Sequence, residues 1–358
     1  MRTLTVPLPG REYDILIRPG LLPQAGGYIC SVVPQARKVA LVTDSHVAPL
    51  YGETVAHSLA RAGFQVETFV VPAGEQSKCS KQLARLWSGF AQFGLTRTDC
   101  VVALGGGVVG DLAGFAAATI LRGVDFVQLP TTLLAQVDSS VGGKVAIDLP
   151  AGKNLAGAFW QPKLVLMDPA ALGTLDDRTF SDGMAEVIKY GCIADAGFFS
   201  FLQTHPSRGE IMGEIESVLY TCCDIKRKVV LADERDTGVR MLLNFGHTLG
   251  HAYEKAGHYR TWTHGQAVAA GMVKVTELGE RLGVSPAGLA AEIGVLLGCF
   301  GLPVAIGCSM DDYAAAIGLD KKGAGDDLSL ILLDRVGHAL AHKLPRAQLL
   351  DLLGEETR

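Results

Sequence analysis

Residues 100–115, CVVALGGGVVGDLAGF, decide the fold of this chain. The apolar run at 100–104 is typical of a buried strand. Gly105, Gly107 and Gly110 follow it with the spacing G-x-G-x-x-G, where a predicted helix begins. Glycine at these positions permits a tight turn and lets backbone N–H groups approach a pyrophosphate closely, and the helix N-terminus adds a favourable dipole. The segment therefore predicts a dinucleotide-binding turn, with a strand-to-helix turn that binds no ligand as the alternative.

Short β-rich runs and helical stretches alternate on both sides of this turn. Strands are predicted at 36–44, 65–75, 100–107 and 125–132, and helices at 57–64, 81–94 and 109–123. Such alternation indicates βαβ units and a parallel sheet with both faces covered. We therefore expect an α/β, Rossmann-like N-terminal domain.

The sequence pattern changes near residue 175. Later stretches have the spacing of helices, and the chief strand-like run is 328–334. A length of 358 residues favours about two domains. We expect an α/β domain at 1–177 and a mostly helical domain at 178–358, packed together with a cleft between them.

Composition excludes several classes of protein. Apolar residues make up 48% of the chain and charged residues 19%, so a disordered protein is excluded. Lys and Arg (32) are fewer than Asp and Glu (37), which argues against a strongly basic nucleic-acid binder. No apolar run reaches the ~20 residues that a membrane span needs. With no secretory signal evident and eight scattered cysteines, we expect a cytoplasmic protein without disulfides.

Glycine is the unusual residue in this composition, with 43 among 358 residues. Four of these glycines lie in the segment 129–162, among polar and large apolar side chains. Lys144 and Lys153 lie in this segment, near the predicted dinucleotide turn. Two lysines in such a place suggest an anionic substrate. A glycine-rich crossover with solvated lysines is the alternative.

Glu186, His247 and His264 form a candidate metal site. Glu186 and Lys189 share one face of a predicted helix, and His247 and His251 share a face of another. One carboxylate and two imidazoles from separate helices can hold a zinc ion and leave one position open. A pair of ligands formed by His247 and His251 is the rival assignment, and spacing does not choose between them.

Two further groups of polar residues are candidates for binding. Lys226, Arg240 and Asn244 precede the histidines, either on an exposed charged helix face or directed toward the cleft. Three acids could hold a ribose. They are Asp125, about twenty residues after the glycine turn, and Asp44 and Glu75, which end predicted strands.

Taken together, these residues resemble the 3-dehydroquinate synthase family, sugar-phosphate cyclases related to iron-dependent alcohol and glycerol dehydrogenases. The matching segments run through most of the chain in order: PAGEQSK (72–78), GGGVVGDLAGF (105–115), RGVDFVQLPTTLLAQVDSSVGGK (122–144), GKNLAGAFWQP (152–162), MAEVIKYG (184–191), ADERDTGVRMLLNFGHTLGHA (232–252) and HGQAVAAGM (264–272).

The resemblance implies a fold with the active site in the interdomain cleft, and an enzyme that uses NAD and one divalent metal, zinc or cobalt. It would convert 3-deoxy-D-arabino-heptulosonate 7-phosphate, an anionic sugar phosphate of the shikimate pathway, to 3-dehydroquinate and phosphate. In the family's scheme, oxidation at C5 precedes β-elimination of phosphate, reduction of the ketone, ring opening and intramolecular aldol closure. The family also implies a homodimer.

The resemblance also assigns roles to individual residues. The residues that resemble metal ligands are Glu186, His247 and His264. Those that resemble substrate-site residues are Asp138, Lys144, Asn154, Lys189, Lys226, Arg240, Asn244 and His251. Two residues resemble phosphate contacts: Arg122, which would act across a dimer interface, and either Lys321 or Lys322. Those that resemble NAD contacts are Asp44, Glu75, Lys78, Gly107, Val108, Val109, Gly110, Asp111, Thr131, Thr132, Lys144, Lys153 and Thr174. Asp125 thereby loses the ribose role.

Three positions depart from the common family pattern. Val145, Gln266 and Leu319 stand where threonine, glutamate and arginine are frequent. Related cyclases act on other sugar phosphates, but Arg240 and Asn244 favour a substrate with a carboxylate. A cyclase of secondary metabolism and a metal-dependent polyol dehydrogenase are the alternatives within the enzyme class.

Overall fold

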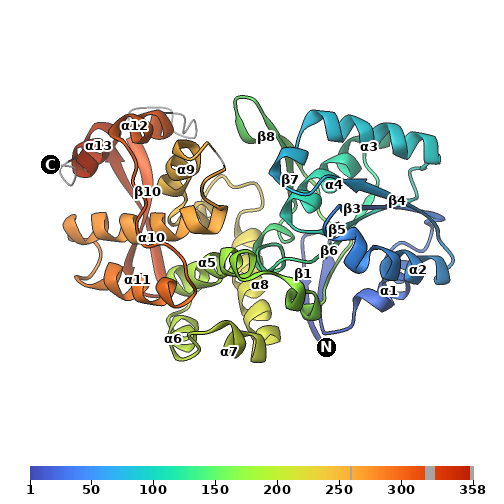
Figure 1. Ribbon diagram of the computed structural model, residues 1–358, viewed down its shortest axis with the longest axis horizontal. Helices are drawn as coiled ribbons and strands as arrows, with labels where there is room; N and C mark the ends of the chain where they lie inside the picture. The colour runs from blue at the N-terminus through green and yellow to red at the C-terminus, as the bar shows by residue number, and fades with distance from the viewer. Residues whose placement is uncertain (259, 319–326, 355–358) are drawn as a thin grey trace. The chain divides into compact units, whose positions relative to one another are not determined.

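The chain forms two compact units in this computed structural model, which describes residues 1–258, 260–318 and 327–354 (Figure 1). Unit 1 comprises Met1–Asp176 and Leu219–Leu231, and unit 2 comprises Asp177–Val218 and Ala232–Arg358. The residues at 219–231, which we expected in the helical second half, pack with unit 1 because their apolar face contacts the first half of the chain. Cys223 Sγ, for example, lies 3.3 Å from the carbonyl oxygen of Gln136.

A seven-stranded sheet forms the centre of unit 1. Its strands, in spatial order, are β1 (Arg2–Val6), β2 (Tyr13–Ile17), β9 (Leu164–Met167), β6 (Asp125–Pro130), β5 (Cys100–Gly105), β3 (Lys38–Asp44) and β4 (Gln65–Val71). All are parallel to one another except β1, which pairs antiparallel with β2. The four strands predicted from the sequence lie at one end of this order, and β1, β2 and β9 were not predicted.

Helices cover both faces of this sheet. Side chains of α1 (Ala25–Val32) and α2 (Glu53–Arg61) pack with one set of strand residues, such as Leu41 and Val102. Side chains of α3 (Ser80–Phe93) and α4 (Gly107–Thr119) pack with the alternate set, such as Val42 and Val101. Successive strand residues point to opposite faces, so both must be apolar in a sheet covered on both sides. The predicted α/β first half is confirmed.

The polar, glycine-rich segment after β6 forms a hairpin. β7 (Lys144–Leu149) pairs antiparallel with β8 (Gly152–Phe159). Val145 is buried on α4, and a Cβ on Gly114 would lie only 2.4 Å from its Cγ1. A large apolar residue at position 145 therefore requires glycine at position 114.

Unit 2 is mostly helical, as expected. Its helices are α5 (Asp177–Ala194), α6 (Ala196–Thr204), α7 (Arg208–Gly213), α9 (His247–Ala256), α10 (His264–Arg281), α11 (Leu289–Cys299), α12 (Met310–Gly318) and α13 (Arg346–Gly354), and α8 (Ile215–Ala232) contributes residues to both units. β10 (Asp327–Arg335) and β11 (His338–Pro345) form a hairpin, of which only β10 was predicted. Among the described helices, none is both long enough and apolar enough to span a bilayer.

Candidate metal and nucleotide sites

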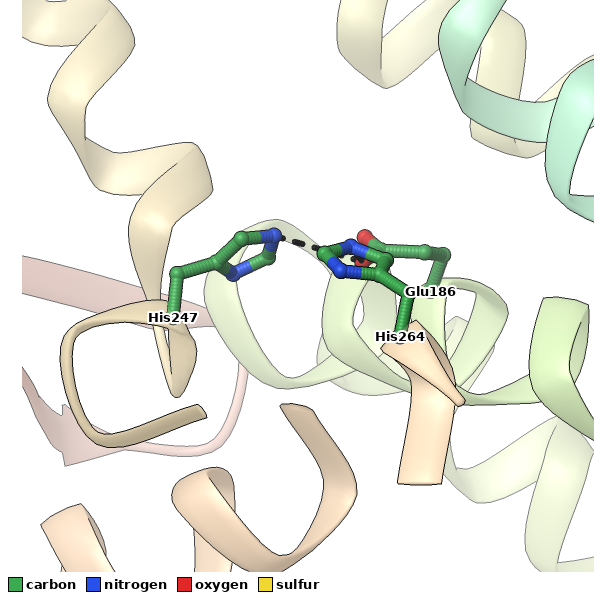
Figure 2. A group of neighbouring side chains, drawn as sticks. All are labelled: Glu186, His247 and His264. Carbon is green, nitrogen blue, oxygen red and sulfur yellow. Dashed lines mark ion pairs between the residues drawn. The ribbon is translucent and has the colours of Figure 1, made fainter. Parts of the chain in front are cut away.

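Glu186, His247 and His264 come together in unit 2 from three helices (Figure 2). Glu186 lies in the middle of α5, whereas His247 and His264 are the first residues of α9 and α10. The Nε2 atoms of both imidazoles lie 3.4 Å from Glu186 Oε1. Two ligand atoms bound tetrahedrally to one zinc ion are about 3.4 Å apart. The spacing of these donors therefore fits a zinc or cobalt site.

The carboxylate of Glu186 needs positive charge around it. Its side chain is fully buried, and neither oxygen accepts a hydrogen bond from the described residues. The ammonium group of Lys189, one turn along α5, contacts Oε2. Burial acts to raise the pKa of Glu186, but Lys189 and His247 outweigh it and hold the pKa well below the ordinary value. An ionised, buried carboxylate with open lone pairs is the kind of group that binds a metal ion.

The groups behind the two imidazoles orient the rings. The carbonyl oxygen of Phe245 can only accept, so it fixes the proton of His247 on Nδ1 at 3.1 Å and turns Nε2 toward Glu186. Glu254 Oε1 lies 3.6 Å from His264 Nδ1. Burial disfavours the charged ring of His264, but the nearby carboxylates of Glu186 and Glu254 outweigh burial and raise its pKa to about 10.

Glu254 was missed in the sequence analysis. It is buried and follows His247 by seven residues, two turns along α9, so the two side chains share a face. That spacing was the available signal. His251 also lies on α9, and its ring is 5.8 Å from that of His247, but it is outside the group of ligand atoms. Of the two ligand sets that spacing left open, the structure brings together the one with Glu186.

Glycines let the three helices approach one another closely. A Cβ on Gly271 of α10 would lie 2.1 Å from the carbonyl oxygen of Gly246, which precedes α9. A Cβ on Gly265 would lie 2.1 Å from the carbonyl oxygen of Asp182 on α5. Both distances are far below van der Waals contact. Residues without a side chain are therefore required where α9 and α5 meet α10.

The remaining candidates in unit 2 lie in a turn before α9. Arg240 is buried, and its Nη1 donates to the carbonyl oxygen of Glu234 at 2.6 Å. Asp233 accepts from the backbone N–H of Arg240 and from that of Gly238. Asn244 ends the same turn, three residues before His247. Arg240 is thus not part of an exposed charged face.

Lys226 lies in unit 1 and is almost completely buried. Its Nζ donates to the side chain of Asp138 and to the carbonyl oxygen of the same residue, both at 2.7 Å. The neighbouring Arg227 and Lys228 instead pair with Asp224 nearer the surface. The basic segment therefore divides between one buried lysine and solvated residues.

The glycine turn has the geometry expected for a dinucleotide. Gly106 precedes α4 in extended conformation, and no side chain caps the helix, so the N–H groups of its first turn point outward. A Cβ on Gly107 would lie 3.0 Å from Ser139 Oγ, so the turn is narrow. Thr131 Oγ1 is buried beside it with no hydrogen-bond partner among the described residues. An unpartnered hydroxyl and an open helix end both fit a pyrophosphate or ribose.

The three candidate ribose acids lie at different ends of the sheet. Asp44 ends β3, next to β5, where its Oδ1 accepts from the N–H groups of the following turn. Glu75 follows β4 at the same end. Asp125 begins β6 and pairs with Lys163 at 3.7 Å. The glycine turn follows the carboxyl end of β5. Asp125 pairs with the first residue of β5 and therefore lies at the opposite end of the strands.

Lys78 is the centre of an ion-pair network in unit 1. Its Nζ lies 2.6 Å from Asp111 Oδ2 and 3.9 Å from Glu75 Oε1, and Lys153 lies 3.8 Å from the same oxygen. Burial raises the pKa of Glu75 and of Asp111, and the lysines offset this rise only in part. Burial acts to lower the pKa of Lys78, but Asp111 and Glu75 outweigh it and raise the pKa.

Other predicted residues lie nearby in unit 1. Thr132 accepts from the N–H of Ala135, and Thr174 bonds Tyr51. The exposed candidates are Lys144, Asn154 and Arg122. The backbones of Asn154 and Arg122 have positive φ, 56° and 69°. Lys321, Lys322 and Leu319 lie outside the described residues. The predicted cleft between the NAD residues of unit 1 and the metal group of unit 2 stays a prediction.

Family models match two adjoining parts of the chain. The model of the 3-dehydroquinate synthase N-terminal region matches residues 68–182, and that of its C-terminal region matches 183–323. The chain is 48% identical over 340 residues to a 3-dehydroquinate synthase of Clostridium botulinum, covering 95% of this chain and 97% of the relative. It is 44% identical over 352 residues to that of Streptococcus suis, covering 98% and 99%.

Solved structures support the same assignment. A 2-deoxy-scyllo-inosose synthase complexed with carbaglucose-6-phosphate, NAD+ and Co2+ superposes with a TM-score of 0.89 at 25% identity, covering 99% of this chain and all of the other. The 2-epi-5-epi-valiolone synthase of Streptomyces hygroscopicus, with NAD+ and Zn2+ bound, gives a TM-score of 0.85 at 27% identity, covering 96% and 97%. The chain therefore belongs to the 3-dehydroquinate synthase family of phosphate-eliminating cyclases.

Proposed function

We propose that the protein converts 3-deoxy-D-arabino-heptulosonate 7-phosphate to 3-dehydroquinate and phosphate with NAD and one divalent metal, zinc or cobalt. The family and the near full-length identity to its named members support this substrate. The observation that carries the proposal is the buried carboxylate of Glu186, with two imidazole nitrogens 3.4 Å from one of its oxygens.

Glu186, His247 and His264 would hold the metal, and the residues around the turn at 105–111 would hold NAD. When bound, the metal would supply Lewis-acid polarisation of the substrate alcohol and ketone, and NAD would supply reversible hydride chemistry. Oxidation at one carbon acidifies the neighbouring C–H, which makes β-elimination of phosphate possible. Because the hydride is returned to the substrate, the atoms of 3-dehydroquinate and phosphate together are those of the substrate, and there is no net oxidation.

The chain's own residues bind and orient the flexible anion. Lys189 contacts Glu186, so its ammonium can meet substrate oxygens beside the metal. Arg240 offers a planar guanidinium for the carboxylate, with Asn244 and His251 nearby in the sequence. Buried Lys226 and partly exposed Asp138 form an ion pair that can hold or move a proton at a hydroxyl. The other substrate contacts proposed are Lys144, Asn154, Arg122 and Lys322.

The proposed assembly is a homodimer in the cytoplasm that needs neither nucleic acid nor a membrane. The family supports the dimer, in which Arg122 would act across the interface between the two subunits. A dimer mass in solution would test this part of the proposal independently of activity.

The function is tested by mixing the protein with NAD, Zn2+ or Co2+ and the heptulosonate phosphate. We expect phosphate and 3-dehydroquinate in equal amounts and no accumulation of NADH. Accumulating NADH with a polyol would instead indicate a dehydrogenase. Turnover of glucose 6-phosphate or sedoheptulose 7-phosphate in preference to the heptulosonate would indicate another cyclase.

The His247→Ala variant tests the metal assignment in this assay. We expect it to lose bound metal and turnover while NAD binding survives, because the residues proposed to contact NAD belong to unit 1. Circular dichroism checks that the variant is folded. Retention of stoichiometric metal and full turnover in the folded variant would contradict the metal assignment.

A further inference from the structure

We infer that Asp182 is a positioning residue for the metal group. Its carboxylate holds the start of α10, and therefore His264, against the helix that carries Glu186. This inference rests on the proposed metal-binding role of Glu186, His247 and His264.

The contact joins two helices within one turn of both ligands. Asp182 precedes Glu186 by four residues on α5, and Gly265 directly follows His264 on α10. Asp182 Oδ1 accepts a hydrogen bond from the backbone N–H of Gly265 at 2.5 Å. The bond closes a loop of 83 residues and determines where the first residue of α10 lies relative to α5.

The backbones of the two helices already touch at this point. A Cβ on Gly265 would lie 2.1 Å from the carbonyl oxygen of Asp182 and 2.7 Å from its Cα. Glycine therefore lets the N–H of residue 265 reach the carboxylate. A helix that starts this close to a neighbour has little freedom to shift unless the hydrogen bond is removed.

The other cap of α10 is internal to that helix. Thr263 Oγ1 accepts from the N–H of Gln266, and the side-chain oxygen of Gln266 accepts from the N–H of Thr263. The two hydrogen bonds of this capping box join only Thr263 and Gln266, and they shape the backbone around His264. The first turn of α10 contains no acidic residue, so Asp182 also supplies the negative charge that a helix N-terminus favours.

The test compares Asp182→Ala with Asp182→Asn. The side-chain amide oxygen of asparagine can still accept the hydrogen bond from the N–H of Gly265. Co2+ affinity is measured by competition with a chromophoric chelator, and the d–d absorption of bound Co2+ reports the geometry of the site. We expect Asp182→Ala to weaken Co2+ binding about 10- to 100-fold, as for other groups that orient metal ligands, and to change the spectrum. We expect Asp182→Asn to restore most of the affinity.

Asp177→Ala is the matched control, because it removes an acid from the same helix whose ion-pair partner is Arg208 and not a residue of α10. The Asp177 side chain is 91% exposed and pairs with Arg208 at 2.6 Å, so metal affinity should not change. NAD binding and circular dichroism confirm that each variant is folded. If Asp182→Ala does not fold, Asp182→Ser replaces it. The serine side chain is too short for its hydroxyl to reach Gly265, so we expect the same loss of Co2+ affinity.

Two outcomes would overturn the role of Asp182 but leave the proposed metal site standing. One is unchanged Co2+ affinity and spectrum in the variant without the acceptor, and the other is an equal loss in Asp182→Asn. Failure of the unaltered protein to bind Co2+ would instead refute the proposed metal site, and the inference with it.

Discussion

At the scale of single residues, each imidazole of the metal group is held by a group on its far side. His247 uses the carbonyl oxygen of Phe245, which its own turn supplies, and His264 uses Glu254 from another helix. Such partners fix the tautomer and the ring orientation, so that Nε2 of each ring faces Glu186. The metal affinity of the site is therefore expected to depend on residues that touch no metal.

Glu254→Gln tests this dependence. The amide keeps the size of the side chain but removes the charge that faces His264 Nδ1, so we expect metal affinity to fall about 10- to 100-fold. Titration with Co2+ measures the change. Glu277→Gln is the control, because that acid is half-exposed on α10 and pairs with Lys274 instead. Equal affinity in the two variants would show that Glu254 does not orient the ring.

At the scale of elements, the crossing of α9 and α10 depends on glycine. Gly271→Ala places a methyl group within 2.1 Å of the carbonyl oxygen of Gly246. We expect a loss of about 1–3 kcal/mol in the free energy of unfolding, since the helices must separate, together with weaker metal binding. Urea unfolding with and without Co2+ measures both effects.

Gly209→Ala is the control for this prediction. Gly209 lies in α7, and a Cβ there would meet nothing within 4 Å. Because alanine is the better helix former, this change should leave stability unchanged or raise it by up to about 1 kcal/mol. Equal destabilisation by both substitutions would refute the packing argument.

A buried acid also ties together the turns that begin β3 and β5. Asp99 accepts hydrogen bonds from the N–H groups of Arg37, Lys38 and Thr96 and from the Thr96 hydroxyl, at 2.7–2.9 Å. Burial acts to raise the pKa of Asp99, but these hydrogen bonds outweigh it and hold the pKa below its ordinary value. Ionised Asp99 therefore stabilises the fold.

Asp99→Asn should lower the free energy of unfolding by about 2–3 kcal/mol near neutral pH, because an amide cannot accept at both positions. A lowered pKa means that this contribution is complete above the unfolded-state pKa, about 3.9, and is lost as pH falls through the folded-state value. Chemical unfolding from pH 7 to 3 should show the difference between the proteins shrinking below about pH 4. Asp125→Asn, which loses only a surface pair, should cost less than about 1 kcal/mol at every pH.

At the scale of the whole molecule, each unit has its own core. Unit 1 packs helices on both faces of its sheet, and unit 2 packs around α10, which is buried over most of its length. The candidate metal group lies in unit 2, and the residues proposed to contact NAD lie in unit 1. Metal binding is thus expected to add stability without creating the fold.

Removing the metal with a chelator should abolish phosphate release and leave the far-UV circular dichroism unchanged. Restoring free metal to 100 times its dissociation constant should raise the free energy of unfolding by about 2.7 kcal/mol. Thermal unfolding at several metal concentrations measures this gain, and NAD titration of the metal-free protein should still give binding. Loss of helical signal on chelation would contradict the prediction.

The sequence predicted those elements whose signals are local. β5 and α4 follow from a buried apolar run, a glycine turn and a helical pattern in one stretch of chain. β1, β2 and β9 were missed because they are short and gain their place by pairing with strands far away in the sequence. Glu254 and Asp182 were missed for a similar reason, since each acts on a residue of another helix.

The sequence by itself determined the α/β and helical halves, the dinucleotide turn, the candidate ligand types and the family, because all of these depend on residue type and short spacing. Only the tertiary structure brought both imidazoles within 3.4 Å of the Glu186 carboxylate, placed Asp125 at the opposite end of the strands from the glycine turn, and brought Asp182 to Gly265. These outcomes depend on how closely helices and strands pack, and that distance is set by backbone contacts between segments that are far apart along the chain.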